Sequence, residues 1–136
     1  MSSQAGFREI EHTADWELEV WAPDLPALLE QAARGMNALS GVQIEQGPVQ
    51  QRIFVLPATD SEKLLVSFLS ELLYVQERDG LVFVSFNLTL HEDRLLARVE
   101  GVPLHSLDKE IKAVTYHNLR LRQTQRGVEA CIVFDV

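Results

Sequence analysis

The sequence predicts an α+β fold in which two helices pack on one face of a largely antiparallel β-sheet. Only two long stretches repeat apolar residues at helical spacing, and several others alternate apolar and polar residues as strands do. The late strands follow one another through links of hairpin length, which join antiparallel neighbours. A chain of 136 residues with 46% hydrophobic and 24% charged residues is expected to form one domain over residues 1–136.

The first third of the chain predicts a strand followed by a helix. Residues 16–21 alternate with period 2, after a short strand or lead-in over residues 7–10. A helix is then expected over residues 25–39, with Asp24 as its N-cap and Gly41 just after its end. Its apolar positions are Leu25, Leu28, Leu29, Ala32, Ala33 and Met36.

A second strand and helix follow. Residues 42–48 are punctuated by glycine and proline and are read as a loop, and residues 50–56 are a strand candidate. Thr59 and Glu62 match the spacing of a capping box in front of an apolar run. The second helix is therefore expected over residues 60–77.

The last third of the chain predicts mainly strands. Apolar and polar residues alternate over residues 82–90, and Glu92-Asp93 suits a hairpin turn into the next strand. A helical turn is expected at residues 106–110. The expected strands of this part cover residues 82–90, 95–100, 113–122 and 128–136.

The composition limits the kinds of partner and location that are expected for this protein. The net charge of −8 and pI near 4.9 disfavour direct nucleic-acid binding, and they suit a cation or a partner with a basic surface; solubility alone also accounts for them. One cysteine, Cys131, allows no intramolecular disulfide. No signal-peptide pattern is present, and residues 64–75 are too short and polar to span a membrane, so a cytoplasmic location is expected.

Candidate chemistry gathers near the two ends of the chain. Asp15 stands at the entrance of the first clear strand, three residues after His12, and Asp135 precedes the last residue, Val136. His12 and Asp15 suit an acid/base pair, a metal site or a structural hydrogen bond. We interpret Asp15 and Asp135 as one oxygen-lined site that prefers calcium, magnesium or manganese to zinc. Lys112 is a candidate to pair with either carboxylate or to bind a phosphate.

Four stretches, taken together and in this order, are similar to the archease family. They are the His-Thr-Ala-Asp segment at residues 12–15, residues 60–74, the Lys-Ala-Val-Thr-Tyr-His segment at 112–117, and the closing residues 133–136. The resemblance covers nearly the full length. It implies a protein cofactor of an RtcB-type RNA ligase that promotes guanylylation and multiple turnover of the ligase in tRNA splicing and RNA repair.

The resemblance also implies site residues. Calcium, or another divalent ion such as magnesium or manganese, would be held by Asp15, Asp135 and the main chain of Val136, with His12 and Lys112 as functional residues. Val136 ends this sequence, so its oxygens are expected to be a terminal carboxylate. The family is also linked to a chaperone-like role towards a tRNA methyltransferase.

A metal-dependent hydrolase using His12, Asp15 and Lys112 is a third reading of the sequence. No nucleophile elbow, phosphate-binding glycine loop or paired-cysteine motif accompanies these residues. Their absence makes a self-sufficient enzyme the less favoured reading, and the resemblance implies a non-catalytic protein cofactor.

Overall fold

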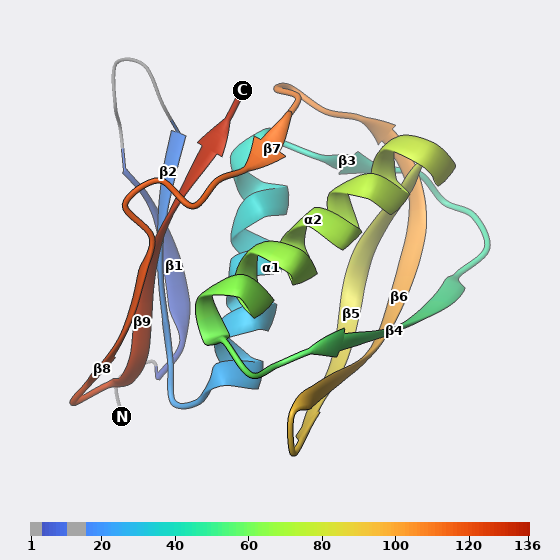
Figure 1. Cartoon of the computed structure of the whole chain (residues 1–136). Coiled ribbons are helices and arrows are strands. Elements are labelled where there is room, and N and C mark those ends of the chain that lie inside the picture. Colours follow the sequence, from blue (N-terminus) through green and yellow to red (C-terminus); the bar gives the residue numbers. More distant parts are fainter. Residues whose placement is uncertain (1–3, 11–15) are drawn as a thin grey trace.

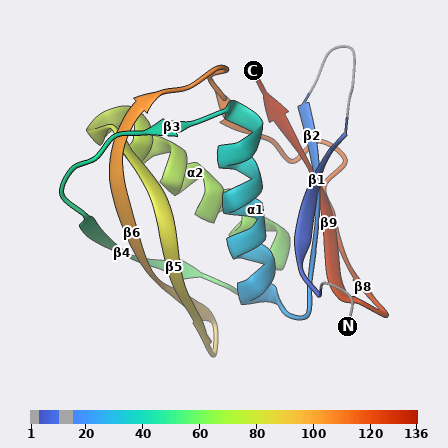
Figure 2. The ribbon, with the colours of Figure 1, turned by 180° about the vertical axis from the view of Figure 1, so that it is seen from behind.

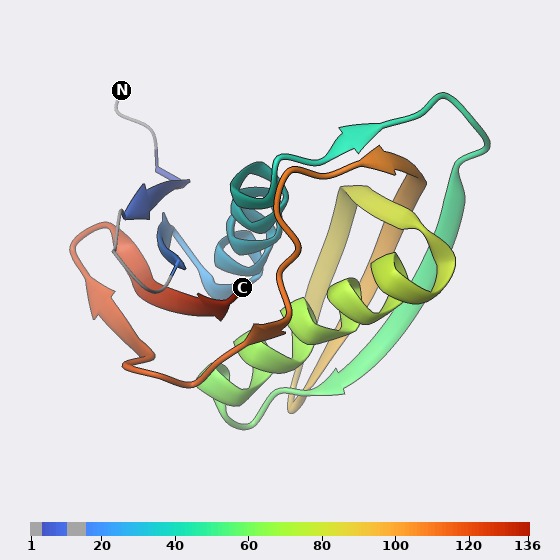
Figure 3. The ribbon, with the colours of Figure 1, turned by 90° about the horizontal axis from the view of Figure 1, so that it is seen from above.

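The computed structural model describes residues 4–10 and 16–136, in which two helices lie between two antiparallel sheets (Figures 1 and 3). The first sheet has the strand order β1-β2-β9-β7, and β8 also pairs with β9; in the second, β6 pairs with β3, β4 and β5. The strands are β1 (Gly6–Ile10), β2 (Trp16–Ala22), β3 (Gln43–Ile44), β4 (Gln50–Pro57), β5 (Leu81–His91), β6 (Arg94–Ser106), β7 (Ala113–Val114), β8 (Arg120–Thr124) and β9 (Gly127–Asp135).

The first sheet joins the two ends of the chain. β2 pairs with β9 from Trp16 opposite Phe134 to Ala22 opposite Val128. The view from behind shows β1 and β2 beside β9 on the same side of the molecule (Figure 2). Because side chains alternate along a strand, one face of this sheet is apolar and faces the helices while the other carries charges. Its fully buried members are Leu18, Val20, Ala22, Ile132 and Phe134.

Helix α1 (Leu25–Ser40) has the caps that the sequence predicts. The Asp24 carboxylate accepts a hydrogen bond from the backbone N–H of Ala27 at 2.9 Å, and Gly41 ends the helix with a φ of 66°. Gly35 allows the helix to approach the first sheet closely, because a Cβ there would lie 2.6 Å from Cδ2 of Leu18. The expected helix over residues 25–39 is confirmed.

Helix α2 (Ser61–Asp79) starts from a different cap. The sequence suggested Thr59 as the capping residue, but the Asp60 carboxylate accepts the N–H groups of Glu62 and Lys63 at 3.0 and 3.1 Å. The Glu62 side chain does not complete a capping box. It accepts a hydrogen bond from the backbone N–H of Leu121 at 2.9 Å and thereby ties α2 to β8.

Two expectations for the late chain are wrong. Residues 113–122 do not form one strand, because Asn118 takes a left-handed φ of 53° and the N–H of Leu119 bonds back to the carbonyl of Tyr116 at 3.1 Å. Residues 106–110 are not a helical turn. There the N–H groups of Asp108 and Lys109 both donate to the carbonyl of Ser40, so the segment follows the end of α1.

The α+β fold class is confirmed, and the structure adds that the strands divide into two sheets. Each helix packs against both sheets, so each needs an apolar surface wider than the single stripe of a surface helix. In α2 the consecutive residues Leu64, Leu65 and Val66 are all buried. Within the described ranges, neither helix is long and apolar enough to cross a membrane.

Candidate functional site

The candidate site lies at the edge of the first sheet where β2 begins and β9 ends, with β7 beside β9. This edge is close to the chain terminus marked C in Figure 1. Phe134 is the anchor of this edge: it pairs with Trp16 on one side and with Val114 on the other, and its side chain is fully buried. Asp135 follows directly and is exposed. The alternation of strand side chains thus buries Phe134 and leaves the Asp135 carboxylate in water.

Lys112 lies beside Asp135. Its backbone N–H donates to the carbonyl oxygen of Asp135 at 2.7 Å, and Ala113 stands opposite Asp135 in the ladder. The hydroxyl and N–H of Thr115 both donate to the carbonyl of Val133, at 2.9 and 3.1 Å. These bonds fix the backbone that carries Asp135. The Lys112 ammonium forms no ion pair with Asp135 in the part of the chain described.

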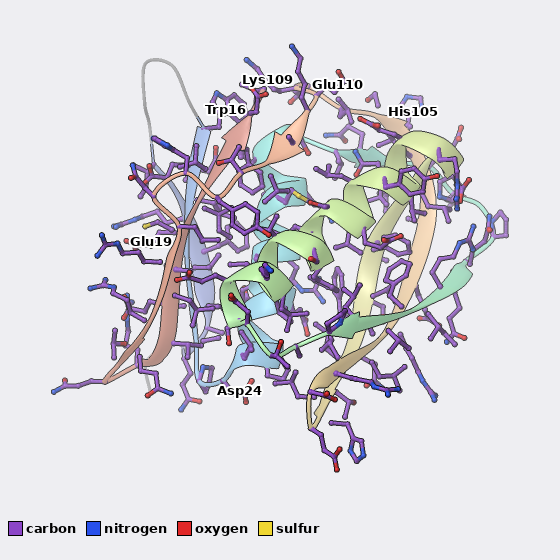
Figure 4. The ribbon with its side chains drawn as sticks, viewed as in Figure 1. Trp16, Glu19, Asp24, His105, Lys109 and Glu110 are labelled. Atoms are coloured by element: carbon purple, nitrogen blue, oxygen red, sulfur yellow. The ribbon has the colours of Figure 1, made fainter. Side chains whose placement is uncertain are left out.

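A second cation borders the same edge. Nζ of Lys109 lies 4.8 Å from the centroid of the Trp16 ring, a cation–π contact. Lys109 is held there because its N–H donates to the carbonyl of Ser40 at 3.1 Å, which ties residues 107–112 to the end of α1. Figure 4 shows Trp16, Lys109 and Glu110 together at this end of the molecule. Sequence reasoning missed Lys109, because neither residue of the pair carries a local signal of the other.

The structure therefore brings together three of the five predicted site residues, Lys112, Asp135 and Val136. The other two, His12 and Asp15, lie outside the described residues, and the predicted metal site stays a prediction. Among residues 4–10 and 16–136, no group of three His, Cys, Asp or Glu side chains is arranged to hold a metal ion. The Asp135 carboxylate and the main-chain oxygen of Val136 are hard donors, which fit calcium, magnesium or manganese better than a soft metal.

Comparison with known proteins identifies the family. The model of the archease protein family matches residues 7–136. The chain belongs to the archease family. It is 35% identical to the protein archease of Methanosarcina barkeri, with all of both chains covered, and 31% identical to that of Methanopyrus kandleri, with 93% of this chain and 97% of that one covered.

Solved structures of the same shape agree with this membership. Protein 1598 of Methanobacterium thermoautotrophicum superposes with a TM-score of 0.76 at 23% identity, covering 96% of this chain and 99% of that one. An archease of Thermotoga maritima, described as a possible chaperone, superposes with a TM-score of 0.71 at 22% identity, covering 95% and 96%. At these identities the likeness shows that the archease fold is shared.

Proposed function

We propose that this archease activates an RtcB-type RNA ligase, promoting its guanylylation and its multiple turnover. A divalent cation, calcium or else magnesium or manganese, is held by Asp15, Asp135 and the main chain of Val136. His12 and Lys112 face the ligase. Family membership supports the proposal. In this proposal the protein acts in the cytoplasm, in tRNA splicing and RNA repair. The archease itself performs no catalysis.

One observation supports the proposal that Asp15 and Asp135 hold the same cation. Trp16, which follows Asp15 in the sequence, pairs with Phe134, which precedes Asp135. The two aspartates are therefore chain neighbours of residues that lie side by side in the sheet. A calcium ion takes 6–8 oxygen ligands, so Asp135 and Val136 alone would leave most positions to Asp15, the ligase or water.

The surroundings of Asp135 suit a contact with a basic active site. The chain carries a net charge of −8, and an acidic protein is attracted to a cationic cleft and repelled by an RNA backbone. RNA contact is accordingly left to the ligase. The N–H of Lys112 fixes the Asp135 backbone, and its exposed ammonium is free to meet a phosphate. The cation, when bound, supplies positive charge that stabilises phosphoryl transfer.

The test follows covalent GMP transfer to the ligase with GTP, with and without the archease. Asp135→Asn removes the charge without changing the shape of the side chain, and we expect it to abolish activation while circular dichroism stays unchanged. Asp93→Asn is the matched control, because Asp93 is exposed on the hairpin between β5 and β6. Full activation by Asp135→Asn would remove this carboxylate from the mechanism.

Metal removal tests the cation separately. The archease is stripped with a chelator, dialysed, and returned to a ligase that keeps its own manganese. We expect the stripped protein to bind calcium in a calorimetric titration and Asp135→Asn to bind it far more weakly. Equal binding by Asp135→Asn and Asp93→Asn would show that the ion is held elsewhere.

The second candidate function is a chaperone-like module for a tRNA methyltransferase. The description of the Thermotoga maritima relative as a possible chaperone favours it, as do the exposed apolar residues of the edge strand β4. Ile53 and Val55 are 56% and 58% exposed there. This candidate predicts co-purification with the methyltransferase that a chelator does not disturb. Complexes that dissociate on chelation would favour the ligase role.

A further inference from the structure

The outer face of the first sheet carries charges in ordered rows. This face points away from the helices, and the register of β1, β2, β9 and β8 aligns its residues from strand to strand. The two rows are Arg8–Glu19–Cys131–Arg120 and Gly6–Trp21–Glu129–Arg122. Three arginines, Arg8, Arg120 and Arg122, thus share one face of a chain whose net charge is −8, together with Glu19 and Glu129.

A cavity of ≈ 200 Å³ opens on this face. Liquid water occupies about 30 Å³ per molecule, so the space would hold a small polyatomic anion. Figure 4 labels Glu19 on this side of the molecule. We call the cavity the arginine pocket; its polar lining is Glu19, Asn118, Arg120, Arg122, Glu129 and Cys131.

Both carboxylates of the arginine pocket already have cationic partners. Glu19 accepts a hydrogen bond from Arg8 at 2.9 Å. Glu129 accepts one from Arg126 at 2.9 Å and another from the Thr124 hydroxyl at 2.7 Å. Their negative charges are thus largely offset by arginines that do not line the pocket.

Arg120 and Arg122 have no close ionic partner among the described residues. Arg122 does stand opposite Glu129 in the β8–β9 ladder, and after the hydrogen bonds from Arg126 and Thr124 its charge also lowers the pKa of that carboxyl. Neither guanidinium forms an ion pair or hydrogen bond with another residue in the ranges 4–10 and 16–136. They stand two residues apart on β8, so their side chains leave the strand on the same face. Each guanidinium offers five N–H donors in a planar fork that matches phosphate oxygens.

The backbone around these arginines is fixed before any ligand arrives. Leu121, between them, donates its N–H to the Glu62 carboxylate of α2, and its partly buried side chain packs against the core. The turn before β8 is closed by the bond from Leu119 to Tyr116, and Asn118 takes its left-handed conformation there, at the rim of the pocket. A preformed site loses little freedom on binding, which favours affinity.

We propose that the arginine pocket binds a small phosphate-bearing ligand, with Arg120 and Arg122 as the charged contacts and Asn118 as a polar contact. The ligand is free phosphate or a phosphomonoester of a small molecule. Asp135 lies on the same face of β9, four residues beyond Cys131, but does not line the pocket. The proposal does not depend on the ligase role.

Cys131 is a built-in reporter, because it lines the pocket and is the only cysteine of the chain. The test measures its alkylation by the neutral reagent iodoacetamide at constant ionic strength, with increasing inorganic phosphate, with a nucleoside monophosphate, or with chloride alone. We expect saturable protection by at least one phosphate compound and none by chloride. Tighter binding of the nucleotide assigns the pocket to a phosphomonoester, and equal binding assigns it to the phosphate group itself.

Variants test which side chains hold the phosphate. Arg120→Gln and Arg122→Gln should each weaken binding about tenfold, since each removes a charge-assisted contact. Arg94→Gln, on the hairpin of the second sheet, should bind as the parent does. Phosphorus NMR of phosphate mixed with each protein checks the result without the thiol. Absent protection, protection by chloride, or equal loss in Arg94→Gln would overturn the proposal.

Discussion

The hydrogen bond from Leu121 to Glu62 links α2 to β8 and predicts a defined loss on Glu62→Ala. A bond to a charged acceptor contributes about 1.5–3 kcal/mol, and a carboxylate in the first turn of a helix adds about 0.3–1 kcal/mol. Glu62 is half-exposed, so the low end applies, and we expect a loss of about 2 kcal/mol in the free energy of unfolding. At this chain length that corresponds to a fall in Tm of roughly 8 °C.

The assay is urea unfolding followed by circular dichroism, together with hydrogen exchange of the Leu121 amide by NMR. Glu62→Gln keeps an acceptor and should lose only about 1 kcal/mol. Glu77→Ala is the control near the other end of α2, where the side chain is exposed, and it should change stability by less than about 0.5 kcal/mol. If Leu121 exchanges no faster in Glu62→Ala than in Glu77→Ala, the bond does not hold β8 in place.

Two further predictions concern the β8–β9 hairpin. The hydrogen bond from Arg126 lowers the pKa of Glu129 below its ordinary 4.5. The ionised Glu129 side chain therefore stabilises the folded state at pH values above 4.5, and this stabilisation is lost as the pH falls through the pKa of the folded state. Denaturant curves should show the parent more stable than Glu129→Gln at neutral pH, with the gap shrinking between about pH 5 and pH 3; a constant gap would contradict it. The second prediction concerns Gly127, whose φ is 119° and where a new Cβ would lie 2.7 Å from Cα of Pro23. Gly127→Ala should therefore lower the free energy of unfolding, measured by denaturant curves, by about 2–4 kcal/mol. Gly80→Ala, at φ 66° with no atom within 4 Å, should cost about 1–2 kcal/mol, and an equal cost at both positions would refute the steric argument.

The helices could be predicted because their signals are local. Apolar spacing, the Asp24 cap and the left-handed Gly41 all fall within a few residues of the helix that they define. The longer strands were found for the same reason, since alternation is visible along one segment. The two-residue strand β3 was not found, because it lies in residues 42–48, which were read as a loop. Alternation says which face a residue takes but not which strand lies beside it, so the division into two sheets could not be derived.

The candidate site was predicted only as far as sequence neighbours allow. Lys112 and Asp135 were both named from motifs, and the structure places them side by side through a backbone hydrogen bond. The contact of Lys109 with Trp16 depends on how residues 107–112 follow the end of α1, and no local pattern encodes that path.

The arginine pocket could not be predicted from the sequence either. Its lining comes from β2, β9, β8 and the turn before β8, and it exists only once the register of those strands is set. Arg120 and Arg122 alone look like ordinary surface residues. What distinguishes them is that the neighbouring carboxylates already pair with other arginines.

The pairing of β2 with β9 also bears on how the molecule folds. Their residues are roughly a hundred positions apart along the chain, and such contacts raise the contact order and slow folding. During synthesis, the edge of β2 that pairs with β9 stays unpaired until β9 itself has been made. Until then this edge of β2 stays open to pairing with other chains.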